Sequence, residues 1–204
     1  MEKDNCWQCG HRSEASLFCR FCNALQPPVM DYYRFLGMPR RLRVDASQLE
    51  ATFYQLSRLL HPDRYLRRTP RERQYSLEAT AILNDAYRIL RDPVKRAEYV
   101  LGQEGFNIAD QRGKDVPPEL LEEVFELNEA LEELRGGDEA ARPELEKARE
   151  RFLGMRQETD RELDRLYAEF DETGARETLA RIRAVLNRRR YISNLVGEVE
   201  KELL

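Results

Sequence analysis

The sequence has no long hydrophobic run, because no apolar stretch approaches the roughly 20 residues that a membrane-spanning helix needs. The polar start, MEKDNCWQCGHR, lacks both the apolar segment of a secretory signal and the Arg- and Ser-rich, acid-poor composition of a mitochondrial presequence. These absences predict a soluble protein of the bacterial cytoplasm, with a processed mitochondrial form as the alternative. No repeat, low-complexity tract or useful run of period-two alternation is visible, so the sequence favours helices over sheets.

The chain also lacks an excess of positive charge, since 34 basic residues face 38 acidic ones and the net charge is -4. This balance disfavours a uniformly basic binder of polyanions. It hides an asymmetry, however: residues 1–104 carry 17 basic and 13 acidic side chains, whereas the rest of the chain carries 17 and 25. We expect the basic first part and the acidic second part to bind different partners.

All four cysteines lie in the first 22 residues and form two CxxC pairs, Cys6 with Cys9 and Cys19 with Cys22. The two-residue spacing lets both thiolates of a turn reach one ion at about 2.3 Å, which predicts a closed structural zinc site. Iron bound as in rubredoxin uses the same ligands and is not excluded, and disulfides in an oxidising compartment are the other alternative. We interpret His11 as a surface residue rather than as a replacement ligand.

A segment this short cannot fold on packing alone and must depend on the metal. We expect the site to be covered by Trp7, Leu17, Phe18 and Phe21. The sequence leaves open whether the module stabilises the protein, forms a homodimer or contacts another partner. The 29 Arg against 5 Lys suggest a zinc-ribbon nucleic-acid binder as a further class, but the second half of the module carries only Arg12 and Arg20, too few for a phosphate-binding footprint.

Helical patterns dominate the rest of the chain. Asp45 or Ser47 caps a helix that must end at His61, because Pro62 follows, and the next long helix ends at Asp92-Pro93. Three later amphipathic patterns, separated by two glycine-containing breaks, predict an antiparallel bundle. The predicted fold is therefore all-α apart from the metal module. Its expected parts are a four-cysteine zinc module at 1–28, a helical domain at 29–104, a linker at 105–117 and a three-helix bundle at 118–204.

The most informative stretch is LLHPDR, in which the tripeptide His61-Pro62-Asp63 ends one helix and precedes another. The tripeptide alone is a weak signal, because Pro and Asp also end ordinary helices. Here it lies between two amphipathic helices, about 30 residues into a segment that begins with a short Tyr-rich helix. This arrangement resembles the J domain of DnaJ-type co-chaperones, whose HPD loop joins an antiparallel helical hairpin. The resemblance assigns a J domain to residues 29–104.

Further motifs narrow the resemblance. The chain contains MDYYRFLGMP, HPDRY, ILNDAY and DPVKRAEY ahead of an acidic C-terminal bundle. Together these strings resemble the HscB family of iron-sulfur co-chaperones. The cysteine module with the adjoining FCRFCNALQPP is similar to the N-terminal extension of the zinc-bearing members of that family. The similarity covers nearly all 204 residues.

The resemblance implies an adaptor without enzymatic activity. Such a protein binds an IscU-type iron-sulfur scaffold, delivers it to a DnaK-class, HscA-like chaperone and stimulates ATP hydrolysis by that chaperone through the HPD triad, which aids cluster transfer. His61 and Asp63 would offer polar contacts held by the rigid Pro62, and no Ser or Cys has the spacing that would make His61 a general base. A general J-domain co-chaperone for another client is the alternative. We expect no nucleic-acid or membrane partner.

Arginine dominates the residues around the HPD motif. Residues 58–73 carry six arginines against Asp63 and Glu72, a net charge of +4. Such a patch can steer an acidic partner, and although most charge runs are solvated helix faces, the neighbouring HPD motif favours partner binding. The predicted chaperone-binding residues are His61, Pro62, Asp63, Arg58, Arg64, Arg67 and Arg68.

The first bundle helix has an acidic outer side, because residues 119–139 carry nine acidic side chains and one basic one. At about 100° per residue, Leu121 and Phe125 lie roughly 100–140° from the apolar stripe, which predicts an apolar pair exposed in an acidic frame. Burial of the pair against the J domain is the alternative. The same geometry places Tyr191 about 130° from the stripe of its own helix and favours its exposure.

In the HscB family, the outer face of this helix binds the scaffold protein. Motif alignment then implies the scaffold-binding residues Leu121, Glu122, Phe125, Glu126, Glu129, Glu133 and Tyr191. Glu122 departs from the family pattern, because family members usually carry an apolar residue there, often Met. This departure makes the scaffold-binding face more acidic and puts its affinity in question.

Overall fold

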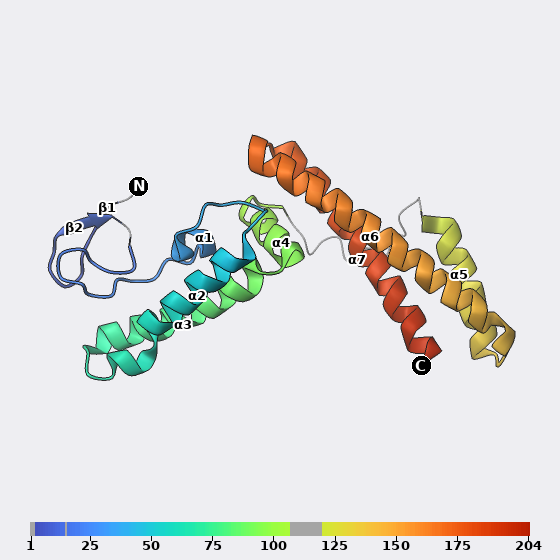
Figure 1. Ribbon diagram of the computed structural model, residues 1–204, viewed down its shortest axis with the longest axis horizontal. Helices are drawn as coiled ribbons and strands as arrows, with labels where there is room; N and C mark the ends of the chain where they lie inside the picture. The colour runs from blue at the N-terminus through green and yellow to red at the C-terminus, as the bar shows by residue number, and fades with distance from the viewer. Residues whose placement is uncertain (1–2, 15, 107–119) are drawn as a thin grey trace. The chain divides into compact units, whose positions relative to one another are not determined.

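The computed structural model describes residues 3–14, 16–106 and 120–204. Its two compact units are Met1–Arg96 and Ala97–Leu204, and the predicted linker at 105–117 lies outside the described residues except for its first two positions. Outside the four-cysteine module, the described residues form helices and their connections, as the predicted all-α fold requires. Figure 1 shows these elements, which are β1 (Lys3–Asn5), β2 (Arg12–Glu14), α1 (Tyr32–Leu36), α2 (Ala46–Leu60), η1 (Pro62–Tyr65), α3 (Pro70–Leu90), α4 (Pro93–Gln103), α5 (Leu121–Arg135), η3 (Glu139–Ala141), α6 (Arg142–Thr173) and α7 (Arg176–Leu203).

The module consists of two turns with the same hydrogen-bond pattern. In the first, the amide of Cys6 donates to His11 O and the amide of Gly10 donates to Cys6 O, both at 2.9 Å. In the second, Cys19 and Asn23 stand where Cys6 and Gly10 stand in the first, with bonds of 2.9 and 2.8 Å. Gly10 and Asn23 both have positive φ, which glycine and asparagine tolerate best. The strands β1 and β2 pair antiparallel on either side of the first turn.

Helices α2 and α3 form the hairpin that the HPD motif joins, and their ends agree with the predicted signals. Asp45 caps α2, because its carboxylate accepts hydrogen bonds from the amides of Ser47 and Gln48. The helix ends at Leu60 with His61 as its C-cap. Thr69 caps α3 in a capping box with Glu72, a signal that the sequence interpretation did not use. The hairpin buries an apolar stripe of Leu49, Leu60, Ala79, Ile82, Leu83, Ala86 and Leu90.

The second unit contains a long hairpin of α6 and α7, and the shorter α5 packs at one end of it (Figure 1). The predicted breaks are confirmed, since α5 ends at Arg135 before the C-cap Gly136, and α6 ends at Thr173 before the C-cap Gly174, whose φ of +63° is left-handed. The bundle therefore contains three packed helices only where α5 lies against the α6–α7 hairpin. Its core cluster consists of Leu120, Leu127, Ala130, Leu131, Leu145, Phe152, Ile192, Leu195, Val196 and Val199.

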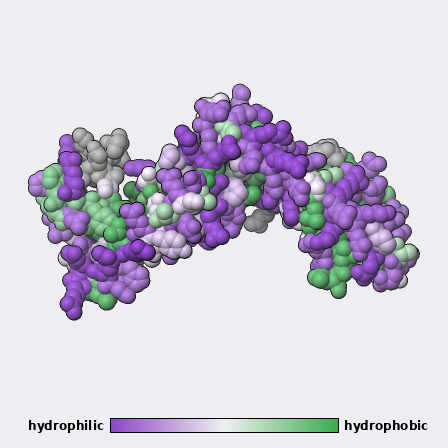
Figure 2. Space-filling view, viewed as in Figure 1, coloured by the Kyte–Doolittle hydropathy of each residue, from purple (hydrophilic) through white to green (hydrophobic). Residues whose placement is uncertain are grey.

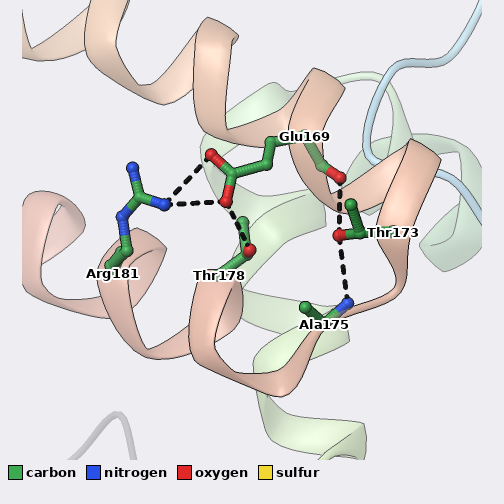
Figure 3. A network of polar contacts seen from close by, with 5 residues as sticks. All are labelled: Glu169, Thr173, Ala175, Thr178 and Arg181. Atoms are coloured by element: carbon green, nitrogen blue, oxygen red, sulfur yellow. Dashed lines mark hydrogen bonds and ion pairs between the residues drawn. The ribbon is translucent and has the colours of Figure 1, made fainter.

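The turn between α6 and α7 is held by the polar network in Figure 3. The carboxylate of Glu169 on α6 accepts hydrogen bonds from Thr178 Oγ1 at 2.8 Å and from the Arg181 guanidinium at 2.7 and 3.0 Å, both on α7. Thr173 Oγ1 donates to the backbone carbonyl of Glu169 at 2.8 Å and accepts from the amide of Ala175 at 3.2 Å. These hydrogen bonds pair backbone groups at the end of α6 that have no partner within the helix, and they join the end of α6 to the beginning of α7.

The visible surface is mostly hydrophilic, as Figure 2 shows. In the part of the chain that the structure describes, no helix is both long enough and apolar enough to cross a membrane. Apolar side chains that stay exposed are therefore of interest as contact sites, and they include the Leu121 and Phe125 pair on α5.

Candidate functional site

The four cysteines converge on one point. Their Sγ atoms all lie within 4.8 Å of one another, with Cys6 and Cys22 at 3.6 Å and Cys9 and Cys19 at 3.7 Å. Four sulfurs placed tetrahedrally at 2.3 Å from one ion are about 3.8 Å apart, so the group fits a metal. All four thiols are free, and the separations far exceed the roughly 2.05 Å of a disulfide. The cysteines thus form a group that can hold a metal ion, and the disulfide alternative is not found.

The surroundings of Cys6 favour its thiolate form, whereas burial and the neighbouring thiols raise the pKa of Cys9 and of Cys22. Burial raises the pKa of the Cys6 thiol, but hydrogen bonds from the backbone amides of Cys9 and Gln8 and from the other thiols outweigh this effect and lower the pKa to about 6. The Gln26 side-chain amide also donates to Cys6 Sγ at 3.4 Å. Thiolates that accept N–H donors are the ligands that a structural metal site needs.

The predicted apolar cover of this site needs one correction. Leu25 is fully buried in the module, although the sequence interpretation did not include it, and Phe21 is 52% exposed instead of covering the sulfurs. The ring of Phe21 stacks on His11 at 4.6 Å and lies under the Arg20 guanidinium. The Phe21 ring thus packs on polar neighbours at the surface of the module and does not cover the sulfurs. His11 is exposed, as predicted, and is not part of the metal-binding group.

The HPD motif forms a tight turn with exposed polar side chains. Pro62 begins the short helix η1, and His61 Nδ1 accepts a hydrogen bond from the Asp63 amide at 3.3 Å. The Asp63 carboxylate lies 3.5 Å from the same nitrogen, and the two side chains are 56% and 78% exposed. Nδ1 is thus used within the turn, which leaves Nε2 of His61 as the ring nitrogen available to a partner.

The turn is anchored through the last carbonyl groups of α2. Because α2 ends at Leu60, its last carbonyls have no donor within the helix and need other donors. Ser76 Oγ on α3 donates to Leu60 O at 2.6 Å, and Thr80 Oγ1 donates to the same oxygen at 3.2 Å. The hydroxyl of Tyr65 donates to Leu59 O at 3.2 Å, and burial raises the pKa of this tyrosine. Side chains from η1 and α3 therefore fix the backbone that carries the HPD triad.

The arginines around the turn form a surface that we call the basic patch, made of Arg58, Arg64, Arg67, Arg68, Arg71 and Arg73. All six are exposed, and none forms an ion pair with another described residue. Glu72, counted in the net charge of this stretch, is only 5% exposed, because its carboxylate accepts the Thr69 amide and hydroxyl. The Glu72 carboxylate is therefore used within the first turn of α3 and is not exposed among the arginines.

The outer face of α5 exposes the predicted apolar pair. Leu121 and Phe125 are 56% and 71% exposed, whereas Leu127 and Leu131 on the opposite side are buried. Glu129 continues the face, since residues four apart lie above one another on a helix. We call this surface, with Leu121, Glu122, Phe125, Glu126, Glu129 and Glu133, the α5 face.

The other predicted members of this surface have distinct positions. Glu126, Glu129 and Glu133 line a groove of about 480 Å³ between α5 and α6. Arg151 of α6 lies 3.5 Å from Glu126 and therefore joins the two helices there. Tyr191 on α7 is half-buried and packs against the core cluster, and burial raises its pKa. The exposure expected for Tyr191 is thus only partial, because its side chain packs against the core cluster.

Comparison with known proteins finds similar domains in both parts of the chain. Residues 31–99 match the model of the DnaJ domain, and residues 116–200 match that of the HSCB C-terminal oligomerisation domain. The chain is 31% identical to the mouse iron-sulfur cluster co-chaperone protein HscB over 201 residues, which span 96% of this chain and 81% of the mouse protein. The chain belongs to the HscB family of J-type co-chaperones.

Other HscB proteins extend the similarity. The co-chaperone protein HscB homolog of Azoarcus sp. (strain BH72) is 34% identical over 174 residues, 85% of this chain and 93% of that protein. The crystal structure of human co-chaperone protein HscB superposes with a TM-score of 0.74 at 28% identity and covers 98% of both chains. Chaperone HscB from Vibrio cholerae gives a TM-score of 0.58 at 26% identity, over 84% of this chain and 96% of that one.

The side chains that support these surfaces were not predicted from the sequence. Ser76 and Thr80 anchor the HPD turn, and their signal was a pair of small polar residues four apart, beside the apolar side of α3. The contact of Trp7 with Arg71 and Tyr75 was not predicted either. Contacts between segments more than 60 residues apart have no periodic pattern by which a single sequence could reveal them.

Proposed function

We propose that this protein binds an IscU-type iron-sulfur scaffold protein, delivers it to a DnaK-class, HscA-like chaperone and stimulates ATP hydrolysis by that chaperone. The observation that carries the proposal is the anchored HPD turn, with exposed His61 and Asp63 beside six arginines that have no ion-pair partner among the described residues. The chain acts as an adaptor, and the chemistry belongs to the chaperone. The relatives are named as co-chaperones, which supports this role.

The HPD turn supports a contact that is both polar and rigid. Its backbone is held by hydrogen bonds from Ser76, Thr80 and Tyr65, so little conformational entropy is lost when a partner binds. The basic patch supplies long-range attraction for an acidic surface, which raises the association rate and makes it sensitive to salt. We assign Arg58, Arg64, Arg67 and Arg68 to this chaperone-docking surface.

The α5 face is the proposed scaffold-binding surface. Exposed Leu121 and Phe125 supply an apolar anchor, and the surrounding glutamates supply a polar rim, which is the usual anatomy of a protein interface. Tyr191 is proposed as an additional aromatic contact. Glu122 is exposed beside the apolar pair and makes this interface more acidic than the family pattern.

The four-cysteine group is proposed to hold a structural zinc ion. Cys6, Cys9, Cys19 and Cys22 would supply all four ligands, and such a closed site stabilises the fold of the module without leaving a position for a substrate. Iron has the same ligand preference and is distinguished by metal analysis of the purified protein.

A single-turnover ATPase assay with the DnaK-class chaperone, with and without the scaffold protein, tests the whole proposal. We expect this protein to raise the hydrolysis rate, and we expect the scaffold to raise it further than the sum of the separate effects. An absence of any stimulation contradicts the assignment of the HPD turn. If this protein raises the hydrolysis rate but the scaffold does not alter that rate, the scaffold assignment is contradicted. That outcome supports a J-domain co-chaperone for another client.

A further inference from the structure

The tryptophan of the first CxxC turn has its orientation set from within the module. Trp7 lies between Cys6 and Cys9 and is the single tryptophan of the 204 residues. Its indole Nε1–H donates to the carbonyl of Leu25 at 2.7 Å, and Leu25 is fully buried just after the second CxxC turn. The only polar atom of the indole therefore joins the first CxxC turn to the segment that follows the second CxxC turn. The direction of the ring depends on the fold that the four cysteines organise.

The same indole ring contacts the beginning of α3. The guanidinium of Arg71 lies over the ring, 5.2 Å from its centroid, and the ring of Tyr75 meets it edge-on at 6.3 Å and 75°. Arg71 and Tyr75 are one turn apart on α3, directly after the HPD loop, and both belong to the same compact unit as Trp7. A residue of the metal module thus contacts a member of the basic patch.

The module also faces α1 and α2. A groove of about 820 Å³ separates it from α1 and α2, with Trp7, Phe18 and Val29 on one side and Phe35, Leu56 and Leu59 on the other. An open groove contributes little packing, because atoms that face a gap lose their dispersion contacts. The contact of Trp7 with Arg71 and Tyr75 is a direct link between the module and the helical hairpin.

We propose that the metal-bound four-cysteine module is a positioning element of the chaperone-docking surface, in which Trp7 holds the Arg71 guanidinium ready for an acidic partner. A guanidinium stacked on an aromatic face keeps its N–H donors at the edge free for carboxylates, and its ordering before binding reduces the entropy lost on binding. Loss of the metal releases Trp7, frees Arg71 and weakens docking, while the HPD turn stays anchored through Ser76. This inference rests on the proposed chaperone interaction.

The position of Trp7 can be measured directly, since excitation of tryptophan in this protein reports one residue. We expect removal of the metal from the full-length protein with EDTA under reducing conditions to shift the Trp7 emission to longer wavelength, and zinc to restore it. Arg71→Gln, a change outside the module, is expected to alter the emission of the metal-bound protein and to have no effect on the metal-free protein. Phe21→Leu, which changes an exposed aromatic of the same module, is the matched control and should leave the emission unchanged.

Chaperone affinity, measured by titration calorimetry, gives the second readout. We expect Trp7→Leu, Arg71→Gln and metal removal each to weaken binding by about threefold to tenfold, the range of a cation–π contact, and their combination to weaken it no further. Arg67→Gln, in the same patch but without a contact to Trp7, should weaken binding equally with and without metal. Arg71→Lys keeps the charge without the planar stack and should recover only part of the affinity.

The outcomes separate this inference from the proposed function. If His61→Gln abolishes ATPase stimulation but metal removal and Arg71→Gln leave the chaperone affinity unchanged, the positioning role is wrong and the chaperone interaction stands. If Arg71→Gln weakens binding as strongly in the metal-free protein as in the metal-bound protein, Arg71 acts without Trp7 and the positioning role is again wrong. If no variant changes chaperone binding or stimulation, the proposed function itself fails.

Discussion

The hydroxyl of Ser76 donates a 2.6 Å hydrogen bond to the carbonyl of Leu60, the residue that precedes the HPD triad. Sixteen positions separate the two residues, so the bond joins the beginning of α3 to the end of α2. Ser76 and Leu60 are both fully buried, and the bond is therefore shielded from water. A buried hydrogen bond thus holds the backbone directly before the exposed triad. Loss of this bond is expected to affect both the stability of the hairpin and the proposed docking surface.

Ser76→Ala is expected to lower the free energy of unfolding by about 1–3 kcal/mol, because it removes the shorter of the two hydrogen bonds to a buried carbonyl. Urea unfolding followed by circular dichroism measures the change. Gln74→Ala, which removes only an exposed contact with Glu78 on the same helix, is the control and should change stability by less than about 0.5 kcal/mol. Equal losses in the two variants would show that the bond to Leu60 has no special weight.

His61→Gln is expected to abolish stimulation of the DnaK-class ATPase and to leave the fold intact, because the side chain is 56% exposed. Single-turnover hydrolysis measures the stimulation, and calorimetry with the scaffold protein should give an unchanged affinity. The other histidine of the chain, His11, offers a matched control, since it is also exposed and His11→Gln should retain full stimulation. An undiminished hydrolysis rate with His61→Gln contradicts the role of the HPD turn.

The double change Leu121→Ala with Phe125→Ala is expected to weaken scaffold binding by about 2–4 kcal/mol, as for interface anchors. Thermal stability should hardly change, because both side chains are exposed in the free protein. Leu127→Ala on the buried side of α5 should behave in the opposite way and cost about 2–5 kcal/mol of stability. Unchanged scaffold affinity in a folded double variant would exclude the α5 face as the binding surface.

The stability of the bundle should depend on pH through the pair of Arg135 on α5 and Glu202 on α7, whose closest atoms are 2.6 Å apart. The hydrogen bond from Arg135 lowers the pKa of Glu202 below its ordinary value of 4.5, so the pair stabilises the bundle above that pH and loses its effect as the pH falls through the lowered value. Arg135→Gln should therefore reduce the melting temperature slightly at pH 7. The difference from the unchanged protein should disappear in acid, and a difference that grows on acidification would contradict this assignment.

Metal analysis of the purified protein is expected to find about one zinc ion per chain, because the four sulfurs form a single group within 4.8 Å of one another. Cys19→Ser should remove the metal and make the module sensitive to proteases, since folding of so small a segment depends on the ion. The helical signal of α2 and α3 should persist, because their core is separate from the sulfurs. One iron per chain instead would change the identity of the cofactor, and no metal would contradict the site.

Much of the architecture followed from local patterns in the sequence. Asp45, Pro62 and Gly174 determined where helices begin or end, because caps, proline and left-handed glycine act within a few residues. The 3.6-residue period placed Leu121 and Phe125 opposite the core, and the CxxC spacing identified the four cysteines that form one group able to hold a metal ion. Such features can be predicted without the tertiary fold, because they depend on residues that are close together in the sequence.

Only the tertiary structure decided which of these groups meet across the chain. It half-buried Tyr191 against the core cluster of the bundle. It also brought Trp7 of the metal module onto Arg71, 64 positions away. The free energies of such distant contacts depend on how whole elements pack. Residue types and spacing specify the elements, but they do not specify which distant side chains will touch.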